Sequence, residues 1–196
     1  GAASGPSIVL QGHVAERGWL QAVGGGEDVG TTGRGLALQA VRASLEGAGE
    51  GSSVSVAAHV AGIGWQDAAS APSYAGTVGQ GRAVQAVRVS LFGPVSERYD
   101  VWYRVHAAGY GWLGWAKDGE AAGTEGLGVQ AEALQVVLVE KGGDAPSAGG
   151  PAELSVPSLS LRAHVSGVGW QPAVGDGGQT LITRRGLLLG ALGVGV

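Results

Sequence analysis

The sequence predicts an all-β fold made of tandem repeats. Glycine supplies 39 of the 196 residues without a collagen-like period, so we expect it in turns. Apolar residues make up 44% of the chain, which is enough to bury a sizeable core. Short segments between the glycines alternate apolar and polar side chains, as half-buried strands do. Many short strands joined by glycine-rich turns are typical of β-sandwiches, barrels and prisms.

Four Gly-Trp pairs mark the repeats. Each pair follows one of the chain's four histidines at a constant interval, and in three copies a Gly-Thr-x-Gly segment follows in turn. The markers are His13, His59, His106 and His164, then Trp19, Trp65, Trp112 and Trp170, then Thr31, Thr77 and Thr124, with Ile182 at the threonine position of the fourth copy. Matches at so many fixed offsets establish an internal repeat.

Each repeat contains two segments with a period of two. Around Val56 and Val60 the apolar residues alternate with polar ones that include His59, which predicts a strand with the histidine opposite the aliphatic stripe. A second strand is predicted around Val87 and Val89. The apolar phase flips near Leu38, which indicates a β-bulge or a face shared between two layers.

The repeats divide the chain into two predicted domains. Residues 1–142 hold three copies, at about 8–47, 53–93 and 99–140, and a Gly/Pro/Ser/Ala-rich linker follows at 143–153. Residues 154–196 form a fourth, diverged copy, which we expect to be truncated. A single copy cannot bury its apolar stripe, so we expect the first three to close into a pseudo-threefold β-prism, with a β-trefoil as the alternative.

Composition excludes several classes of function. The net charge is −4 and no Lys/Arg cluster is present, so no nucleic-acid partner is expected. The absence of cysteine excludes disulfides, thiolate zinc sites and cysteine nucleophiles, and it suits an exported bacterial protein. The chain also lacks methionine, even at position 1, so we expect a mature or excised piece.

The third copy carries the fullest motif. It has the His and the Gly-Trp pair, a second tryptophan, Trp115, an Asp118-Gly119-Glu120 turn, the Gly-Thr segment and Glu132. This pattern resembles the ChW repeat, the clostridial hydrophobic repeat with a characteristic tryptophan. Gln39 and Gln85 replace the glutamate in copies 1 and 2. The resemblance implies a bacterial secreted or cell-surface protein, with a polysaccharide or cell-envelope ligand and neighbouring surface modules as implied partners.

Tryptophan supplies the candidate ligand-binding residues. Trp102 and Trp115 occur only in the third copy and are the best candidates for exposed aromatics. Trp19, Trp65 and Trp112 are also candidates for stacking on sugars, but the favoured interpretation places the repeated tryptophans in the core, where one large ring per copy would fill the centre.

The remaining side chains do not suggest a catalytic or metal site. Each histidine is expected to hydrogen-bond a neighbouring strand and to stack on the tryptophan of its own copy, and neither a metal nor another cofactor is expected. The Gly-Thr segments lack the lysine of a phosphate-binding loop and are interpreted as tight turns. The acids of the third copy, Asp118, Glu120, Glu125 and Glu132, are interpreted as scattered surface acids, so we expect no enzyme activity.

Arg184-Arg185 and the apolar residues after them resemble a twin-arginine signal at the wrong end of the chain. The segment is too short to span a membrane and aligns with the last strand of the repeat, so we interpret it as a diverged strand. We therefore expect a non-catalytic binding or adhesion module that recognises envelope or environmental polysaccharide. The alternative is a structural or protein-interaction repeat that acts as a spacer for neighbouring surface modules.

Overall fold

The computed structural model of the protein describes residues 5–147, 149–156, 160–175 and 189–195. It falls into two compact units, residues 1–155 and 156–196, which are described separately. Nearly every regular element of the described chain is a strand, and the one helix, α1 (Pro94–Arg98), has five residues. The all-β prediction is therefore confirmed. None of the helices in this part of the chain is long and apolar enough to cross a membrane.

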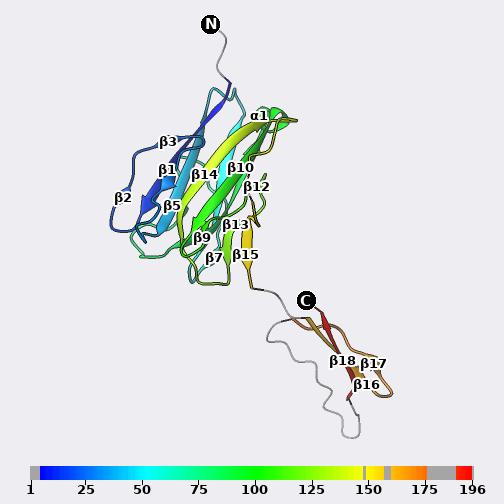
Figure 1. The fold of residues 1–196 in the computed structure, drawn as a ribbon. Coiled ribbons are helices and arrows are strands. Elements are labelled where there is room, and N and C mark those ends of the chain that lie inside the picture. The colour runs from blue at the N-terminus through cyan, green and yellow to red at the C-terminus, as the bar shows by residue number, and fades with distance from the viewer. Residues whose placement is uncertain (1–4, 148, 157–159, 176–188, 196) are drawn as a thin grey trace. The chain divides into compact units, whose positions relative to one another are not determined.

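Each of the first three repeats is built on one long antiparallel hairpin (Figure 1). The hairpins pair β1 (Ser7–Val14) with β5 (Leu38–Glu46), β6 (Ser53–Val60) with β9 (Val84–Phe92), and β10 (Tyr99–Ala107) with β14 (Ala131–Glu140). Buried and partly exposed side chains alternate along β1, so one face of the hairpin lies on the core. The predicted strands and the outward placement of the histidines are both confirmed.

A β-bulge interrupts every hairpin at the same place. In repeat 1 His13 pairs with Ala40 and Val14 pairs with Leu38, which leaves Gln39 without a partner across the hairpin. The same register shift leaves Gln85 and Glu132 unpaired in repeats 2 and 3. The predicted bulge thus falls on the residue at which the ChW pattern carries glutamate.

Short strands complete the sheets. Each Gly-Trp pair forms a two-residue strand against the first long strand of its own repeat. These strands are β2 (Gly18–Trp19), β7 (Gly64–Trp65) and β11 (Gly111–Trp112). Two more, β3 (Val23–Gly24) and β12 (Ala116–Lys117), pair with β1 and β10 respectively.

The Gly-Thr segments form strands that leave their own repeat. Repeat 1 contributes β4 (Val29–Gly30) to the sheet of repeat 3, repeat 2 contributes β8 (Ala75–Gly76) to that of repeat 1, and repeat 3 contributes β13 (Ala122–Glu125) to that of repeat 2. The exchange is therefore cyclic, although the three sheets remain separate and open. The interpretation of these segments as tight turns is incomplete, because bends follow the threonine at residues 32–34 and 78–80 while the preceding glycine pairs with a neighbouring repeat.

The Gly-Thr strand fits its neighbour only because glycine stands at one position. A Cβ atom on Gly30, Gly76 or Gly123 would lie 2.4, 2.3 or 2.3 Å from the carbonyl oxygen of the bulge residue in the neighbouring repeat. All three also have positive φ, at 115°, 98° and 120°. Glycine is thus required both by the backbone conformation and by the close approach.

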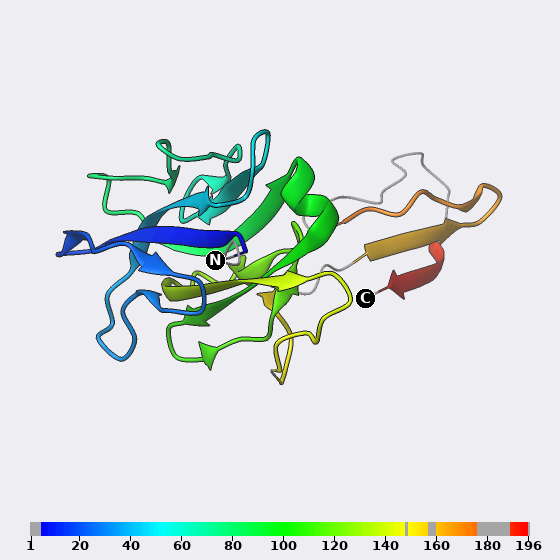
Figure 2. The same ribbon diagram turned by 90° about the horizontal axis from the view of Figure 1, so that it is seen from above.

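One apolar cluster lies between the three hairpins. It combines the inward residues of all three, including Leu10, Val56 and Tyr103, with residues of the exchanged strands such as Val29 and Ala75. In the view from above, the blue loop of repeat 1 and the teal loop of repeat 2 leave the long strands in different directions (Figure 2). Because the exchanged strands contribute to the core, each repeat supplies part of the burial that its neighbour needs.

The chain after repeat 3 remains part of the first unit up to residue 155. β15 (Glu153–Ser155) pairs in parallel with β13, and the N–H of Gly114 donates to the carbonyl of Pro151. The sequence-based boundary between linker and fourth repeat, at 153/154, thus falls inside a strand of the first unit.

The second unit contains the fourth repeat. β16 (Ser160–Val165) pairs with β17 (Gly169–Trp170) and with β18 (Leu189–Gly195), and the register shifts between His164 and Val165 as in the other copies. Ile182 and Arg184-Arg185 lie outside the described residues.

Candidate functional site

The outward face of every hairpin carries a stack of three side chains. The histidine ring meets the tryptophan ring of its own repeat edge to face, with centroids 5.2–5.4 Å apart in the four copies. An arginine lies over the same tryptophan: Arg42, Arg88, Arg104 or Arg162, with its guanidinium carbon 4.1–5.5 Å from the ring centroid. The predicted stacking of histidine on tryptophan is confirmed.

The repeated tryptophans lie outside the core. Trp19, Trp65 and Trp112 are partly exposed, and Trp170 is 50% exposed. The favoured interpretation, in which these rings fill the centre, is therefore wrong. Aliphatic residues and Tyr103 fill that space, because the tryptophan follows a turn that folds back along the outer side of the first strand.

The stacked arginine comes from either strand of the hairpin. In repeat 1 Arg42 stands on the second strand, opposite Gln11 on the first. In repeat 3 the two are exchanged, with Arg104 on the first strand and Gln135 on the second. Both arginines donate from Nε to the glutamine Oε1 at 2.8 Å. Sequence reasoning missed these two arginines because they stand at different repeat positions, and the cross-strand Arg/Gln pair is the signal that would have found them.

Repeat 3 extends the stack into a row, which we call the aromatic row: Trp102, Arg104, Trp112, Trp115 and Lys117. The Arg104 guanidinium lies 4.8 Å from the ring centroids of both Trp112 and Trp115. The Lys117 ammonium lies 5.6 Å from the Trp102 centroid. Trp102, Arg104 and His106 alternate with buried residues on β10, so they share its outward face. All three indoles of the row are partly exposed, and no other repeat carries more than one tryptophan.

A chain of amide contacts orients Arg104. Gln135 accepts from Arg104 through Oε1 and donates from Nε2 to Asp28 Oδ1 at 2.6 Å. Because the Asp28 carboxylate can only accept, it holds the amide with its oxygen toward the guanidinium. Asp28 belongs to repeat 1, so the orientation of the row in repeat 3 depends on the neighbouring repeat.

In repeats 2 and 3 the histidine contacts the bulge residue. His59 Nδ1 lies 3.0 Å from Gln85 Oε1, and His106 Nδ1 lies 3.1 Å from Glu132 Oε2. Gln85 and Glu132 are buried, with 8% and 5% exposure. The glutamate of the third copy therefore lies against its histidine, as Gln85 does in repeat 2. The threonines of the Gly-Thr segments also lie inside the structure. Thr77 and Thr124 are buried and Thr31 is partly buried, and the Thr124 hydroxyl donates to the Val129 carbonyl at 2.9 Å.

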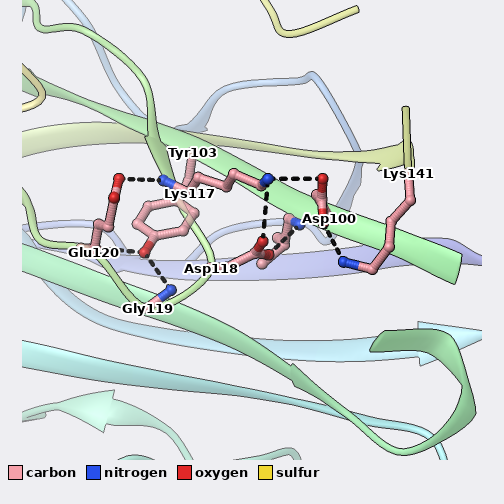
Figure 3. A network of polar contacts seen from close by, with 8 residues as sticks. Asp100, Tyr103, Lys117, Asp118, Gly119, Glu120 and Lys141 are labelled. Carbon is pink, nitrogen blue, oxygen red and sulfur yellow. Dashed lines mark hydrogen bonds and ion pairs between the residues drawn. The ribbon is translucent and has the colours of Figure 1, made fainter. Parts of the chain in front are cut away.

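A second polar network surrounds the Asp118-Gly119-Glu120 turn (Figure 3). The fully buried Tyr103 hydroxyl donates to the Glu120 carbonyl and accepts from the Gly119 N–H at 3.1 Å. The Gly119 N–H also donates to the Val89 carbonyl of repeat 2 at 2.8 Å, and Asp118 accepts from the Val101 N–H at 2.8 Å. The network fixes the turn of repeat 3 against both β10 and repeat 2.

The charges of this network shift its pKa values. Burial raises the pKa of Tyr103 to about 12, and burial also raises the pKa of Asp118 above its ordinary value. Hydrogen bonds from Lys141 and Lys117 lower the pKa of Asp100. The hydrogen bond to Asp100 in turn raises the pKa of Lys117, and the pair is 2.9 Å apart. Lys117 and Lys141 offset the charge of Asp100 and Asp118, while Glu120 accepts from the Lys117 backbone N–H at 3.2 Å, so these charges serve to hold the turn together.

The other acids of repeat 3 do not converge. Glu125 lies on β13 and raises the pKa of Glu153 on β15, after burial, which is the larger cause. Glu132 is buried against His106, away from the Asp118 turn. No group of His, Asp and Glu side chains that could hold a metal occurs among the residues that the structure describes.

Shallow hollows lie where the second strand of one repeat meets the next repeat. The hollow between repeats 2 and 3 has a volume of about 380 Å³ and is lined by Phe92, Tyr99, Asp118, Lys141 and two serines, Ser90 and Ser96. The hollow between repeats 3 and 1, about 280 Å³, is lined mostly by apolar residues and backbone such as Ile8, Gly25 and Leu138. Both hollows are lined by the leucine near the end of the second strand, Leu91 or Leu138, but only the first contains charged side chains, so the outward stacks are the more uniform feature of the repeats.

Comparison with known proteins agrees with the repeated motif. No curated protein and no solved structure matches the chain. The sequence pattern of the family described as Clostridial hydrophobic W, or ChW, matches residues 13–47, 59–93 and 106–140, which together exceed half of the chain. Each match begins at the repeat histidine and ends beyond the bulge residue, so it spans the stack and the exchanged Gly-Thr strand. The chain therefore belongs to the ChW family.

Proposed function

We propose that the protein is a non-catalytic module that binds polysaccharide at the outward face of repeat 3. The observation that carries the proposal is the aromatic row, in which Trp112 and Trp115 lie against Arg104 on the outward face of β10 that also carries Trp102, and all three indoles remain partly exposed. Indole rings pack against the apolar faces of sugar rings, and a row of them suits an extended chain better than a single small molecule.

The architecture supports repeated weak binding. Repeats 1, 2 and 4 each present a single tryptophan in the same stack. A polymer with repeating units can engage more than one such site, which compensates for weak individual contacts. We infer that the cyclic exchange arranges the three sheets of the first unit as a prism, so that its stacks face outward in three directions. We place such a module on the bacterial cell surface or outside the cell.

Binding to a panel of immobilised polysaccharides tests the proposal. We expect the full chain to be retained, with an affinity for short oligosaccharides on the order of millimolar. Trp102→Ala should weaken binding by about fivefold, which corresponds to roughly 1 kcal/mol of stacking energy. Phe92→Ala is the matched control, because Phe92 is an aromatic side chain that is 52% exposed and lies outside the row. No retention on any polysaccharide, or equal effects of the two substitutions, would refute the proposal.

A second candidate function is docking of a neighbouring protein module. The residue before the Gly-Trp pair is an exposed apolar side chain in three copies: Ile63 at 48%, Tyr110 at 58% and Val168 at 54%. Such residues at turn tips suit protein contact better than sugar contact. Replacing Ile63 and Tyr110 by serine should leave polysaccharide retention unchanged, whereas it should abolish capture of a neighbouring module if docking is the function.

A further inference from the structure

Arg104 lies against two aromatic rings, whereas each other arginine of the outward stacks lies against one. Two indole rings, Trp112 and Trp115, each lie 4.8 Å from its guanidinium carbon, and Gln135 accepts from Nε at 2.8 Å. Asp28 fixes the Gln135 amide in turn. A guanidinium that is already oriented loses little conformational entropy when it binds a ligand.

The terminal nitrogens of Arg104 remain available. Within the described residues, neither Nη atom donates a hydrogen bond, and no carboxylate lies within 4.0 Å of the guanidinium. The nearby acids are engaged elsewhere, since Glu132 contacts His106 and Asp100 contacts two lysines. Arg104 thus has no direct carboxylate partner, since Asp28 contacts it only through Gln135, and it presents a free edge of its planar fork on the aromatic row.

From this geometry we propose that the polysaccharide bound by the aromatic row is acidic, and that Arg104 binds a carboxylate of a uronic acid unit. The inference rests on the proposed function and names its ligand class. The free Nη edge matches a carboxylate in bidentate geometry, while the flanking indoles contact the faces of neighbouring sugar rings. Lys117 adds a second cation at the Trp102 end of the row, where Asp100 and Asp118 already neutralise much of its charge.

The other stacks fit this ligand less well. Arg42 has a single ring beneath it and directs both Nε and Nη2 at Gln11, so less of its fork is free. Arg88 and Arg162 are exposed and have one ring each. The chain carries a net charge of −4, so a polyanion is not attracted by the protein as a whole. Any preference for an acidic chain must therefore come from a local site.

Polygalacturonate and its fully methyl-esterified form provide a matched pair of probes, because they share sugar and linkage and differ in charge. We expect the full chain to bind the acid form at least about tenfold more tightly, and added salt to reduce this preference. Arg104→Lys keeps the charge but removes the fork, so it should abolish most of the preference. Arg34→Lys, at an exposed turn of repeat 1, is the control and should bind like the parent chain.

The outcomes separate this inference from the proposed function. Equal affinity for the two polymers, or an Arg104→Lys variant that keeps the preference, overturns the inference. If Trp102→Ala still weakens binding to the esterified polymer in that case, the polysaccharide-binding function stands without the acidic specificity. If neither polymer nor any other polysaccharide is retained, both proposals fail.

Discussion

The peptide N–H of Thr31 donates a hydrogen bond to the carbonyl of Glu132 at 3.0 Å, and this contact joins the first repeat to the third. Thr77 makes the equivalent bond to Gln39 at 2.9 Å. In both cases the acceptor is the extra residue of a β-bulge, whose carbonyl is released from the hairpin ladder. The bulge and the Gly-Thr segment are therefore two halves of one inter-repeat joint.

The close contact within this joint predicts that a side chain at Gly76 strongly lowers the free energy of unfolding. In Gly76→Ala the new Cβ would meet the Gln39 carbonyl at 2.3 Å with backbone at positive φ, so the strand must separate from its neighbour. We expect a loss of about 3 kcal/mol or more in the free energy of unfolding, measured with urea. Gly79→Ala is the control, because its φ is 75° but nothing lies within 4 Å, and it should cost about 1–2 kcal/mol of backbone strain. Similar losses in the two variants would contradict the joint.

The bulge residue predicts which substitutions repeat 3 tolerates. Glu132→Gln reproduces the residue found in repeats 1 and 2, and it should change the free energy of unfolding by less than about 1 kcal/mol at neutral pH. Glu132→Ala leaves His106 Nδ1 without its partner in a largely buried site, which should cost about 1–3 kcal/mol. Thermal unfolding of the two variants distinguishes them, and a glutamine variant as unstable as the alanine variant would show that the negative charge itself is required.

Tyr103 predicts a loss of stability at alkaline pH. Burial raises its pKa in the folded protein to about 12, whereas an unfolded tyrosine has a pKa of about 10. The neutral phenol thus stabilises the fold fully below pH 10, and this contribution of up to about 2–3 kcal/mol disappears as the pH rises toward 12.

Tyr103→Phe provides the comparison. It removes two hydrogen bonds to the Gly119-Glu120 turn and should cost about 1–2 kcal/mol in urea unfolding at pH 9. At pH 11.5 the parent chain should lose most of its stability advantage over Tyr103→Phe. Only the parent has a hydroxyl at residue 103 that must stay protonated in the folded protein. A difference between the two proteins that stays constant with pH would refute the assignment.

Much of the architecture follows from the sequence, because spacing and alternation report local structure. The period of two placed His59 and Val60 on opposite faces, and the phase change at Leu38 indicated the bulge. The partner of each Gly-Thr strand could not be predicted, because Gly76 carries no sign of which repeat it approaches. The outward position of Trp65 was also missed, since a large ring fits a core or a surface stack equally well until its arginine is known. Arg88 identifies Trp65 as part of a surface stack only when the cross-strand neighbours of the hairpin are known.

The exchanged Arg/Gln pairs of repeats 1 and 3 predict that the stack does not depend on which strand carries the arginine. Arg42→Gln should remove the cation–π contact with Trp19 and cost about 0.5–1 kcal/mol, and Gln11→Arg should place two like charges opposite each other. The double variant recreates the arrangement of Arg104 and Gln135, so it should recover the parent's free energy of unfolding to within about 0.5 kcal/mol. A double-mutant cycle by urea unfolding measures this recovery. If the two single losses simply add, the two strands are not interchangeable as carriers of the arginine.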